Sequence, residues 1–291
     1  MHADHFFTIG ETHRQTGQPC EDYALSGTLP DGRVYGVVCD GCSGAMARTD
    51  VGARVLALAM ERALRATSTL AECFEPAFVE RLCDNFQFLM ITEQALDYLA
   101  GIVAFCADRH EAKLFMLGDG AFATAALDGT LELTEVRWPN NAPYYLGYRM
   151  QAEFDRLFRQ DVAPHTRVEV RTSRRERRRP DDQIGPGELV LASRFMEGYV
   201  RKVQLAGLRA LAVCTDGISQ VRGASPLQVG EALLDYKDDS GAFARRRAIR
   251  AMAALERAGA VVEDDLAIAA LTTTDGSGNG AGRPSTSPGS L

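Results

Sequence analysis

The sequence predicts a mixed protein of the α+β class, and three kinds of segment lead to that prediction. Short β-branched and aromatic runs end at turn residues, as strands do. Longer segments repeat apolar residues at helical spacing. Turns such as Pro30-Asp31-Gly32 join neighbouring runs, because proline fixes φ and glycine admits positive φ.

The run Val34–Val38 is the clearest strand signal. It ends on Asp40, a carboxylate, and on a glycine-rich turn. The Pro30-Asp31-Gly32 turn joins it to a run that begins at Tyr23, so the two segments are expected to form a hairpin. Further strands are expected at Phe6–Ile9, Ile102–Cys106, Lys113–Leu117, Ala121–Leu127, Leu131–Val136, Glu188–Ala192, Leu208–Cys214 and Leu266–Leu271.

Amphipathic segments with start and stop signals predict four helices. Pro76 suits a first helical turn, and Ser225 followed by proline reads as an N-cap. Gly259 ends the last segment. The expected helices are Val51–Ala66, a segment from Pro76 extending towards Leu99, Ser225–Tyr236 and Gly241–Ala258.

The pattern weakens between residues 138 and 186. Residues Asn140–Leu146 are interpreted as an ordered loop with exposed aromatic side chains. The segment Arg171–Pro180 contains six arginines and one glutamate, and a solvated loop is favoured over a site for an acidic partner because the whole chain is acidic. Residues 275–291 are rich in glycine, serine and proline without apolar periodicity, which predicts a disordered tail.

Composition limits the classes of function. The chain has 291 residues and a formal net charge of −7, which argues against a general nucleic-acid binder. Seven cysteines without framework-like spacing favour a reducing compartment. No secretory signal or membrane-span pattern is visible, so a cytoplasmic location without a membrane partner is expected.

Four acidic positions occur at the edges of apolar strands. A buried carboxylate is costly to desolvate, and clustered carboxylates raise one another's pKa unless a cation neutralises them. Hard divalent cations do so, and an all-oxygen set favours Mg²⁺ or Mn²⁺ over zinc. For Asp40-Gly41 the alternative is a plain turn, since Asp-Gly is a common turn dipeptide. The positions are Glu21-Asp22, Asp40-Gly41, Asp216-Gly217 and Asp264-Asp265.

The order and spacing of these residues resemble the type 2C metal-dependent protein phosphatases, over about Thr8 to Thr272. The segment Gly10–Asp22 is most similar to a divergent bacterial branch. The matching motifs are Glu21-Asp22, Asp40-Gly41-Cys42-Ser43-Gly44, Gly118-Asp119, Asp216-Gly217 and Asp264-Asp265-Leu266.

The resemblance implies a fold and a domain organisation. The fold would be a four-layer α/β/β/α sandwich, in which a central antiparallel β-sandwich is flanked by helices. Residues 1–274 would form the catalytic domain, with a flap or insert at about 138–186 that shapes substrate choice.

The resemblance also implies a metal site. Asp40 would bridge two Mg²⁺ or Mn²⁺ ions, and Asp216 and Asp264 would complete one of them. Glu21 and the Gly41 carbonyl would hold the other ion. Asp22 would support these ligands, and Asp119 matches a carboxylate associated with a third, weaker ion. Water bridging the metals would attack phosphoserine or phosphothreonine in a phosphoprotein, such as the target of a Ser/Thr kinase, and the enzyme is expected to be a monomer.

The sequence departs from the family pattern at three positions. A phosphate-binding arginine is often found where this chain has Gly17, and Arg14 is the candidate substitute. Cys42 stands where eukaryotic members carry a histidine that serves as a general acid. Gln220 replaces a carboxylate associated with the third ion, which puts that ion in doubt.

Three other functions compete with this interpretation of the sequence. Cys39-x-x-Cys42 would suit a thioredoxin-like site only if it opened a helix after the strand. A haloacid-dehalogenase phosphatase would need a second aspartate at position 42. The serious rival is a pseudophosphatase that binds phosphoproteins or a partner, although idle clustered carboxylates would destabilise its fold.

Overall fold

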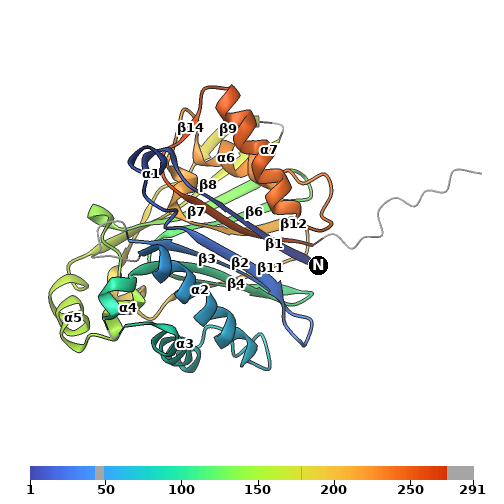
Figure 1. Ribbon diagram of the computed structural model, residues 1–291. Coiled ribbons are helices and arrows are strands. Elements are labelled where there is room, and N and C mark those ends of the chain that lie inside the picture. The colour runs from blue at the N-terminus through green and yellow to red at the C-terminus, as the bar shows by residue number, and fades with distance from the viewer. Residues whose placement is uncertain (43–48, 93, 178, 274–291) are drawn as a thin grey trace, which may run out of the picture.

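Two antiparallel sheets packed face to face form the centre of the protein in a computed structural model (Figure 1). The structure describes residues 1–42, 49–92, 94–177 and 179–273. The larger sheet has the strand order β1-β15-β12-β6-β7-β8-β10, with β9 paired to β8. Its strands are β1 His2–Thr8, β15 Leu266–Thr272, β12 Leu208–Cys214, β6 Gly120–Ala126, β7 Leu131–Arg137, β8 Arg167–Glu176, β9 Arg179–Ile184 and β10 Glu188–Leu191.

The smaller sheet has five strands in the order β11-β5-β4-β3-β2, and β2 and β3 form the expected hairpin. A separate short ribbon pairs β13 with β14. The strands of the smaller sheet and the ribbon are β11 Tyr199–Gln204, β5 Glu111–Leu117, β4 Ala100–Ala107, β3 Val34–Gly41, β2 Tyr23–Thr28, β13 Val221–Arg222 and β14 Val261–Val262.

Helices cover both outer faces of the sandwich. The helices α2 and α3 lie on the smaller sheet, and α6 and α7 lie on the larger one (Figure 1). The helices α1, α4 and α5 are short. The α+β class and the four-layer sandwich are therefore confirmed. The helices are α1 Glu11–Thr16, α2 Thr49–Arg65, α3 Pro76–Leu89, α4 Leu146–Arg149, α5 Ala152–Leu157, α6 Pro226–Leu234 and α7 Phe243–Arg257.

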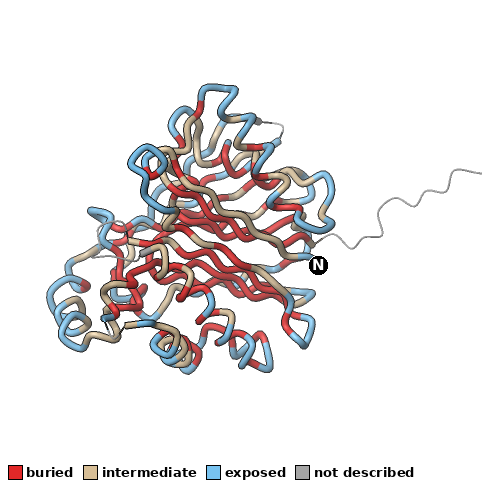
Figure 2. Tube along the Cα trace, viewed as in Figure 1, coloured by how far each residue is buried: buried red, intermediate tan, exposed pale blue. Residues whose placement is uncertain are grey.

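The interior between the two sheets is apolar. Most strand positions are buried, whereas the outer faces of the helices are exposed (Figure 2). At Gly36 on β3 a Cβ atom would lie 2.3 Å from the ring of Phe105 and 2.8 Å from Ala269 of the opposite sheet. Only glycine lets the strands approach so closely. The core is close-packed, so a small shift of the neighbouring side chains cannot make room for a Cβ atom here.

Several sequence-based expectations about local structure are wrong. The second helix ends at Leu89 and does not extend towards Leu99, because Met90 has an extended backbone with ψ of 140°. The arginine-rich segment 171–180 is not a solvated loop. It contributes to β8 and β9. Residues 169–175 of β8 pair with β7.

The aromatic residues between 140 and 146 are also buried rather than exposed. Tyr144 is fully buried and Tyr145 is 8% exposed. The Tyr144 hydroxyl donates to Asp155, so the loop folds back onto α5. The expected disordered tail at 275–291 lies outside the described residues. Within the described part, no helix is long and apolar enough to cross a membrane.

Candidate metal centre

The candidate metal ligands come from four separate places in the chain and meet at one end of the sandwich. Asp40 is the penultimate residue of β3 and pairs with Gly101 at the start of β4. Asp119 lies between β5 and β6, and Asp216 opens a 3₁₀ turn after β12. Asp264 lies two residues before β15. Since Cys214 of β12 pairs with both Ala121 and Ile268, these strand ends share one edge.

Burial and mutual repulsion act on these carboxylates together. Burial raises the pKa of Asp40 well above its usual value, and the charges of Asp216, Asp22, Asp119 and Asp264 raise it further. Mutual repulsion of this kind acts between carboxylates that share one region of the structure. The structure thus brings together carboxylates that are far apart in the sequence.

The other members of the cluster shift in the same direction. Burial, followed by the charge of Asp216, raises the pKa of Asp119 to about 7. Burial and the charge of Asp264 raise the pKa of Asp216 to about 6, opposed by Gln220 and Arg137. The protein alone leaves this cluster with too little positive charge to balance it.

Asp22 is held in place by the neighbouring strand ends. It is 2% exposed, and the Thr215 hydroxyl donates to its Oδ2 at 2.7 Å. The backbone N–H of Ala267 donates to the same hydroxyl at 2.9 Å. Thr215 therefore fixes Asp22 to both β12 and β15.

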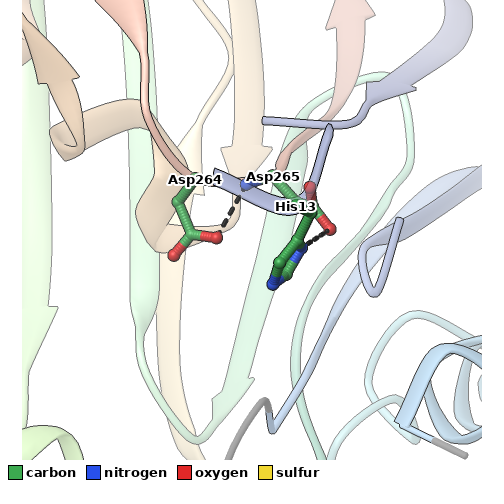
Figure 3. A group of neighbouring side chains, drawn as sticks. All are labelled: His13, Asp264 and Asp265. Carbon is green, nitrogen blue, oxygen red and sulfur yellow. Dashed lines mark hydrogen bonds and ion pairs between the residues drawn. The ribbon is translucent and has the colours of Figure 1, made fainter. Parts of the chain in front are cut away.

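A second group, formed by His13, Asp264 and Asp265, connects the N-terminal segment to β15 (Figure 3). Asp265 accepts three hydrogen bonds, from the Gly10 N–H at 2.7 Å, the Glu21 N–H at 2.6 Å and His13 Nδ1 at 2.9 Å. Its own N–H donates to Asp264 Oδ1 at 2.8 Å. Because both carboxylate oxygens of Asp265 already accept N–H donors, Asp265 is an anchor for ligand-bearing segments.

His13 extends this anchor to Glu21. Its Nε2 lies 3.8 Å from Glu21 Oε2. Burial opposes protonation of His13, but the hydrogen bond and charge of Asp265, with Glu21 and Asp264, outweigh it and raise its pKa. From the sequence, Asp265 is one of the expected acidic positions but has no role separate from Asp264, and His13 has no assigned role. The spacing of His13 before the Glu21-Asp22 pair was the only available signal.

The departures at Cys42 and Gln220, and Arg14 as the candidate substitute for the arginine missing at Gly17, occupy different places. Cys42 is half-buried, and its N–H donates to the Leu99 carbonyl at 3.0 Å. Gln220 Nε2 donates to Asp216 Oδ2 at 2.7 Å, so it contacts the cluster as a donor. Arg14 is exposed, pairs with Glu11 and lines a separate cavity between α1 and α7. Ser43 and Gly44 lie outside the described residues.

Tyr145 lies beside Cys42 at the edge of the cluster. Burial raises the pKa of Tyr145, and Cys42, Asp119 and Asp40 contribute to the rise. Sequence reasoning missed this residue because it interpreted the local aromatic side chains as exposed.

A groove of about 250 Å³ opens beside the carboxylates. Asp119 and Asp216 lie on it together with side chains from the end of β7 and from the loop that follows. The lining residues are Asp119, Gly120, Glu135, Val136, Arg137, Trp138, Asn141, Asp216, Ser219 and Gln220.

The sequence model of the protein phosphatase 2C family matches residues 9–266, which include every carboxylate of the cluster. The chain belongs to the protein phosphatase 2C family. The resemblance inferred from the five motifs is thereby confirmed. No curated protein matches this chain significantly.

Solved structures of similar fold include bacterial serine and serine/threonine phosphatases. The serine/threonine phosphatase Stp1 from Staphylococcus aureus is 11% identical with a TM-score of 0.57, over 94% of this chain and 96% of that one. A serine/threonine phosphatase from S. agalactiae is 12% identical with a TM-score of 0.53, over 92% and 98%. A variant of a bacterial serine phosphatase is 11% identical with a TM-score of 0.58, over 94% and 98%.

Proposed function

We propose that this chain is a metal-dependent phosphoprotein phosphatase that hydrolyses phosphoserine and phosphothreonine with water activated by two Mg²⁺ or Mn²⁺ ions. The observation that supports it most strongly is the meeting of five buried or half-buried carboxylates at one end of a protein phosphatase 2C fold. Their donor set is all oxygen, and their raised pKa values reflect a cluster that lacks positive charge. Hard divalent cations fit both properties.

Each ligand has a proposed place. Asp40 would bridge the two ions, Asp216 and Asp264 would complete one of them, and Glu21 with the Gly41 carbonyl would hold the other. The ions would supply positive charge to the phosphoryl group and lower the pKa of the attacking water. Asp119 is the remaining carboxylate for a third ion.

Other residues of the chain keep these ligands in position. Thr215 holds Asp22 by a 2.7 Å hydrogen bond, and Asp265 holds the Glu21 backbone at 2.6 Å. Gln220 orients Asp216 by donating to one of its oxygens. Such outer contacts fix ligand orientation before metal and substrate bind.

The substrate and setting are part of the proposal. The substrate would be a phosphoprotein, such as the target of a serine/threonine kinase, and the protein would act as a monomer. Support comes from the family and from neighbours described as serine/threonine phosphatases. The proposed location is the cytoplasm, supported by the cysteine usage of the sequence.

The test is hydrolysis by metal-stripped protein to which Mg²⁺ or Mn²⁺ is returned. We expect release of p-nitrophenol from p-nitrophenyl phosphate, and of phosphate from phosphoserine and phosphothreonine peptides, only with metal present. Metal binding measured by calorimetry serves as the parallel readout. A protein that binds metal and phosphopeptide but hydrolyses neither substrate would instead be a pseudophosphatase.

A further inference from the structure

The groove beside Asp119 and Asp216 is lined by groups of both charges. Asp119 and Asp216 contribute two carboxylates of the metal cluster. Arg137, at the end of β7, contributes a guanidinium, and Asn141 lies in the following loop. Gly120 pairs with Val136, so Arg137 lies at the strand position next to Asp119. A phosphate group that binds the metal centre through some of its oxygens therefore has a guanidinium within the same groove for the others.

Arg137 is held at this wall by a buried carboxylate. Its Nη2 donates to Glu135 Oε1, and Glu135 lies two residues earlier on the same face of β7. The Glu135 side chain is 5% exposed, whereas that of Arg137 is 45% exposed. The Ser219 hydroxyl donates to the same Glu135 oxygen at 2.5 Å. A guanidinium has four further N–H donors, so this pairing orients Arg137 without exhausting it.

The loop behind Arg137 is fixed to the metal side of the groove. Trp138 Nε1 donates to the Gly118 carbonyl at 2.7 Å, directly before Asp119. The indole ring packs edge-on against Phe158 and Phe195. The position of Arg137 relative to Asp119 is thus set by a buried hydrogen bond and by aromatic packing.

The other candidate for phosphate binding occupies a different part of the surface. The Arg14 side chain is 60% exposed, and its guanidinium is bound to Glu11 at 3.0 Å and to the Ile9 carbonyl at 3.2 Å. It lines the cavity between α1 and α7 rather than the groove. Gly17, at the usual position of the phosphate-binding arginine, has no side chain to offer.

We propose that Arg137 binds the phosphate group of the substrate in the groove that it lines together with Asp119 and Asp216. This inference rests on the proposed phosphatase function. Arginine suits the task because its planar fork donates two parallel hydrogen bonds to phosphate oxygens. Its pairing with Glu135 and Ser219 makes Arg137 a fixed part of the groove before substrate arrives.

The test compares Arg137→Gln, Arg137→Lys and the control Arg171→Gln. Arg171 is a close match because its guanidinium donates to Glu169, two residues earlier on β8. Arg171 is also the residue of β8 that pairs with Glu135 of β7. It does not line the groove. The first readout is calorimetric binding of inorganic phosphate to the Mg²⁺-loaded protein, and the second is KM and kcat for p-nitrophenyl phosphate.

We expect Arg137→Gln to weaken phosphate binding by roughly tenfold or more and to raise KM more than it lowers kcat, as loss of a charged hydrogen bond would. Arg137→Lys should recover part of the binding, and Arg171→Gln should stay within about twofold of wild type. Phosphate affinity within about twofold of wild type in Arg137→Gln would overturn the proposal. A tenfold loss of phosphate affinity in Arg14→Gln, without such a loss in Arg137→Gln, would also overturn it.

Three further outcomes bear on the proposal. If Arg137→Gln does not fold because Glu135 is left buried with an unbalanced charge, the double variant Glu135→Gln/Arg137→Gln removes both charges and takes its place. If wild type binds phosphate without hydrolysing either substrate, the proposed function fails while the Arg137 proposal is still judged by binding. No phosphate binding by wild type at millimolar concentration refutes the Arg137 proposal itself.

Discussion

The two ends of the five-stranded sheet both bury charged side chains, but they treat those charges in opposite ways. The acidic end, where β3 finishes, holds Asp22, Asp40 and Asp119 with the facing Asp216 and Asp264. The basic end, where β3 begins, holds Arg33 and Lys113. Lys113 of β5 pairs with Cys106 of β4, which pairs with Tyr35 of β3, so the two ends are separated by the length of the sheet.

The protein itself supplies the partners at the basic end. Arg33 donates to Asp31 and to the Thr67 carbonyl, each at 2.6 Å. Lys113 donates to the Ala71 and Cys73 carbonyls and to Glu75, at 2.6, 3.0 and 2.8 Å. These bonds compensate the cost of burying two cations.

The pKa directions express the same contrast. At the basic end, burial opposes ionisation of Asp31, but hydrogen bonds and the charge of Arg33 outweigh it and lower the pKa of Asp31. The bond from Lys113 lowers the pKa of Glu75. At the acidic end the pKa values of Asp40 and Asp119 are raised instead. A buried charge with complete partners serves the fold, whereas an unbalanced group of them indicates where an external ion is expected.

The largest difference between the two ends is expected when one carboxylate charge is removed from each. Asp40→Asn should lower metal-dependent turnover by roughly a thousandfold or more, because Asp40 as the proposed bridging ligand would support several kcal/mol of charge stabilisation. Asp31→Asn removes the same charge at the basic end and should leave kcat within about twofold. The measurement is kcat on p-nitrophenyl phosphate for protein of verified fold. Wild-type rates in Asp40→Asn would remove the two-metal mechanism.

A second prediction concerns whether Cys42, at the acidic end, donates a proton to the leaving group. If this thiol donates no proton, aryl phosphates such as p-nitrophenyl phosphate should react well while alkyl phosphoserine peptides lag. Cys42→His should then narrow the gap between the two rates by up to roughly a hundredfold. Cys42→Ala is the control and should leave the ratio unchanged. A drop in only the alkyl rate of Cys42→Ala would make Cys42 the acid itself.

Lys113 tests whether the basic end serves stability. Lys113→Met removes the donor to the part-buried Ala71 carbonyl and the buried Cys73 carbonyl, and should lower the free energy of unfolding by about 2–4 kcal/mol. Activity per folded molecule should be kept. Lys202, the exposed cross-strand neighbour on β11, gives the matched control, since Lys202→Met should change stability by less than about 0.5 kcal/mol. Urea unfolding followed by fluorescence measures the stability of both variants. Equal losses of stability in Lys113→Met and Lys202→Met would contradict the stabilising role of Lys113.

The smallest expected effect is the pH dependence of metal-free stability. The folded pKa values of Asp216 and Asp119, about 6 and about 7, exceed the unfolded value near 4. The folded state therefore holds more protons between pH 4 and 7, and its free energy of unfolding falls as pH rises through that window.

The melting temperature of metal-free protein should accordingly drop by several degrees from pH 5 to pH 8. Adding Mn²⁺ at pH 8 should reverse the drop, because metal binds the deprotonated folded state. Asp119→Asn should flatten the profile relative to wild type. A wild-type melting temperature that rises steadily to pH 8 without metal would show that the cluster is already neutralised by the protein.

The acidic end was largely predictable from the sequence because each of its parts is local. A buried strand that ends in Asp-Gly, as at Asp40 and Asp216, is visible in a few consecutive residues. The order of such motifs along the chain then identified the family. What the sequence pattern could not show is which side chains the fold packs around them.

The missed features depend on contacts between distant segments. Helix α1 lies in a stretch of mostly polar residues with little apolar periodicity, and His13 finds its partner Asp265 only in the folded protein. The arginines of β8 resemble a solvated loop, yet their strand pairs with β7 and several are bound to acidic neighbours. Arg137 ends an ordinary strand, and only the position of the following loop makes it part of the groove.

The position of β15 has a consequence for the protein during its synthesis. This strand lies between β1 and β12 in the larger sheet, and Asp264 and Asp265 directly precede it. A nascent chain that ends before Glu263 carries the other carboxylates but lacks Asp265, which binds His13 and the Glu21 N–H in the folded protein. Asp264 and Asp265 are therefore the last members of the acidic cluster to leave the ribosome, and the cluster is complete only when the segment before β15 has been made.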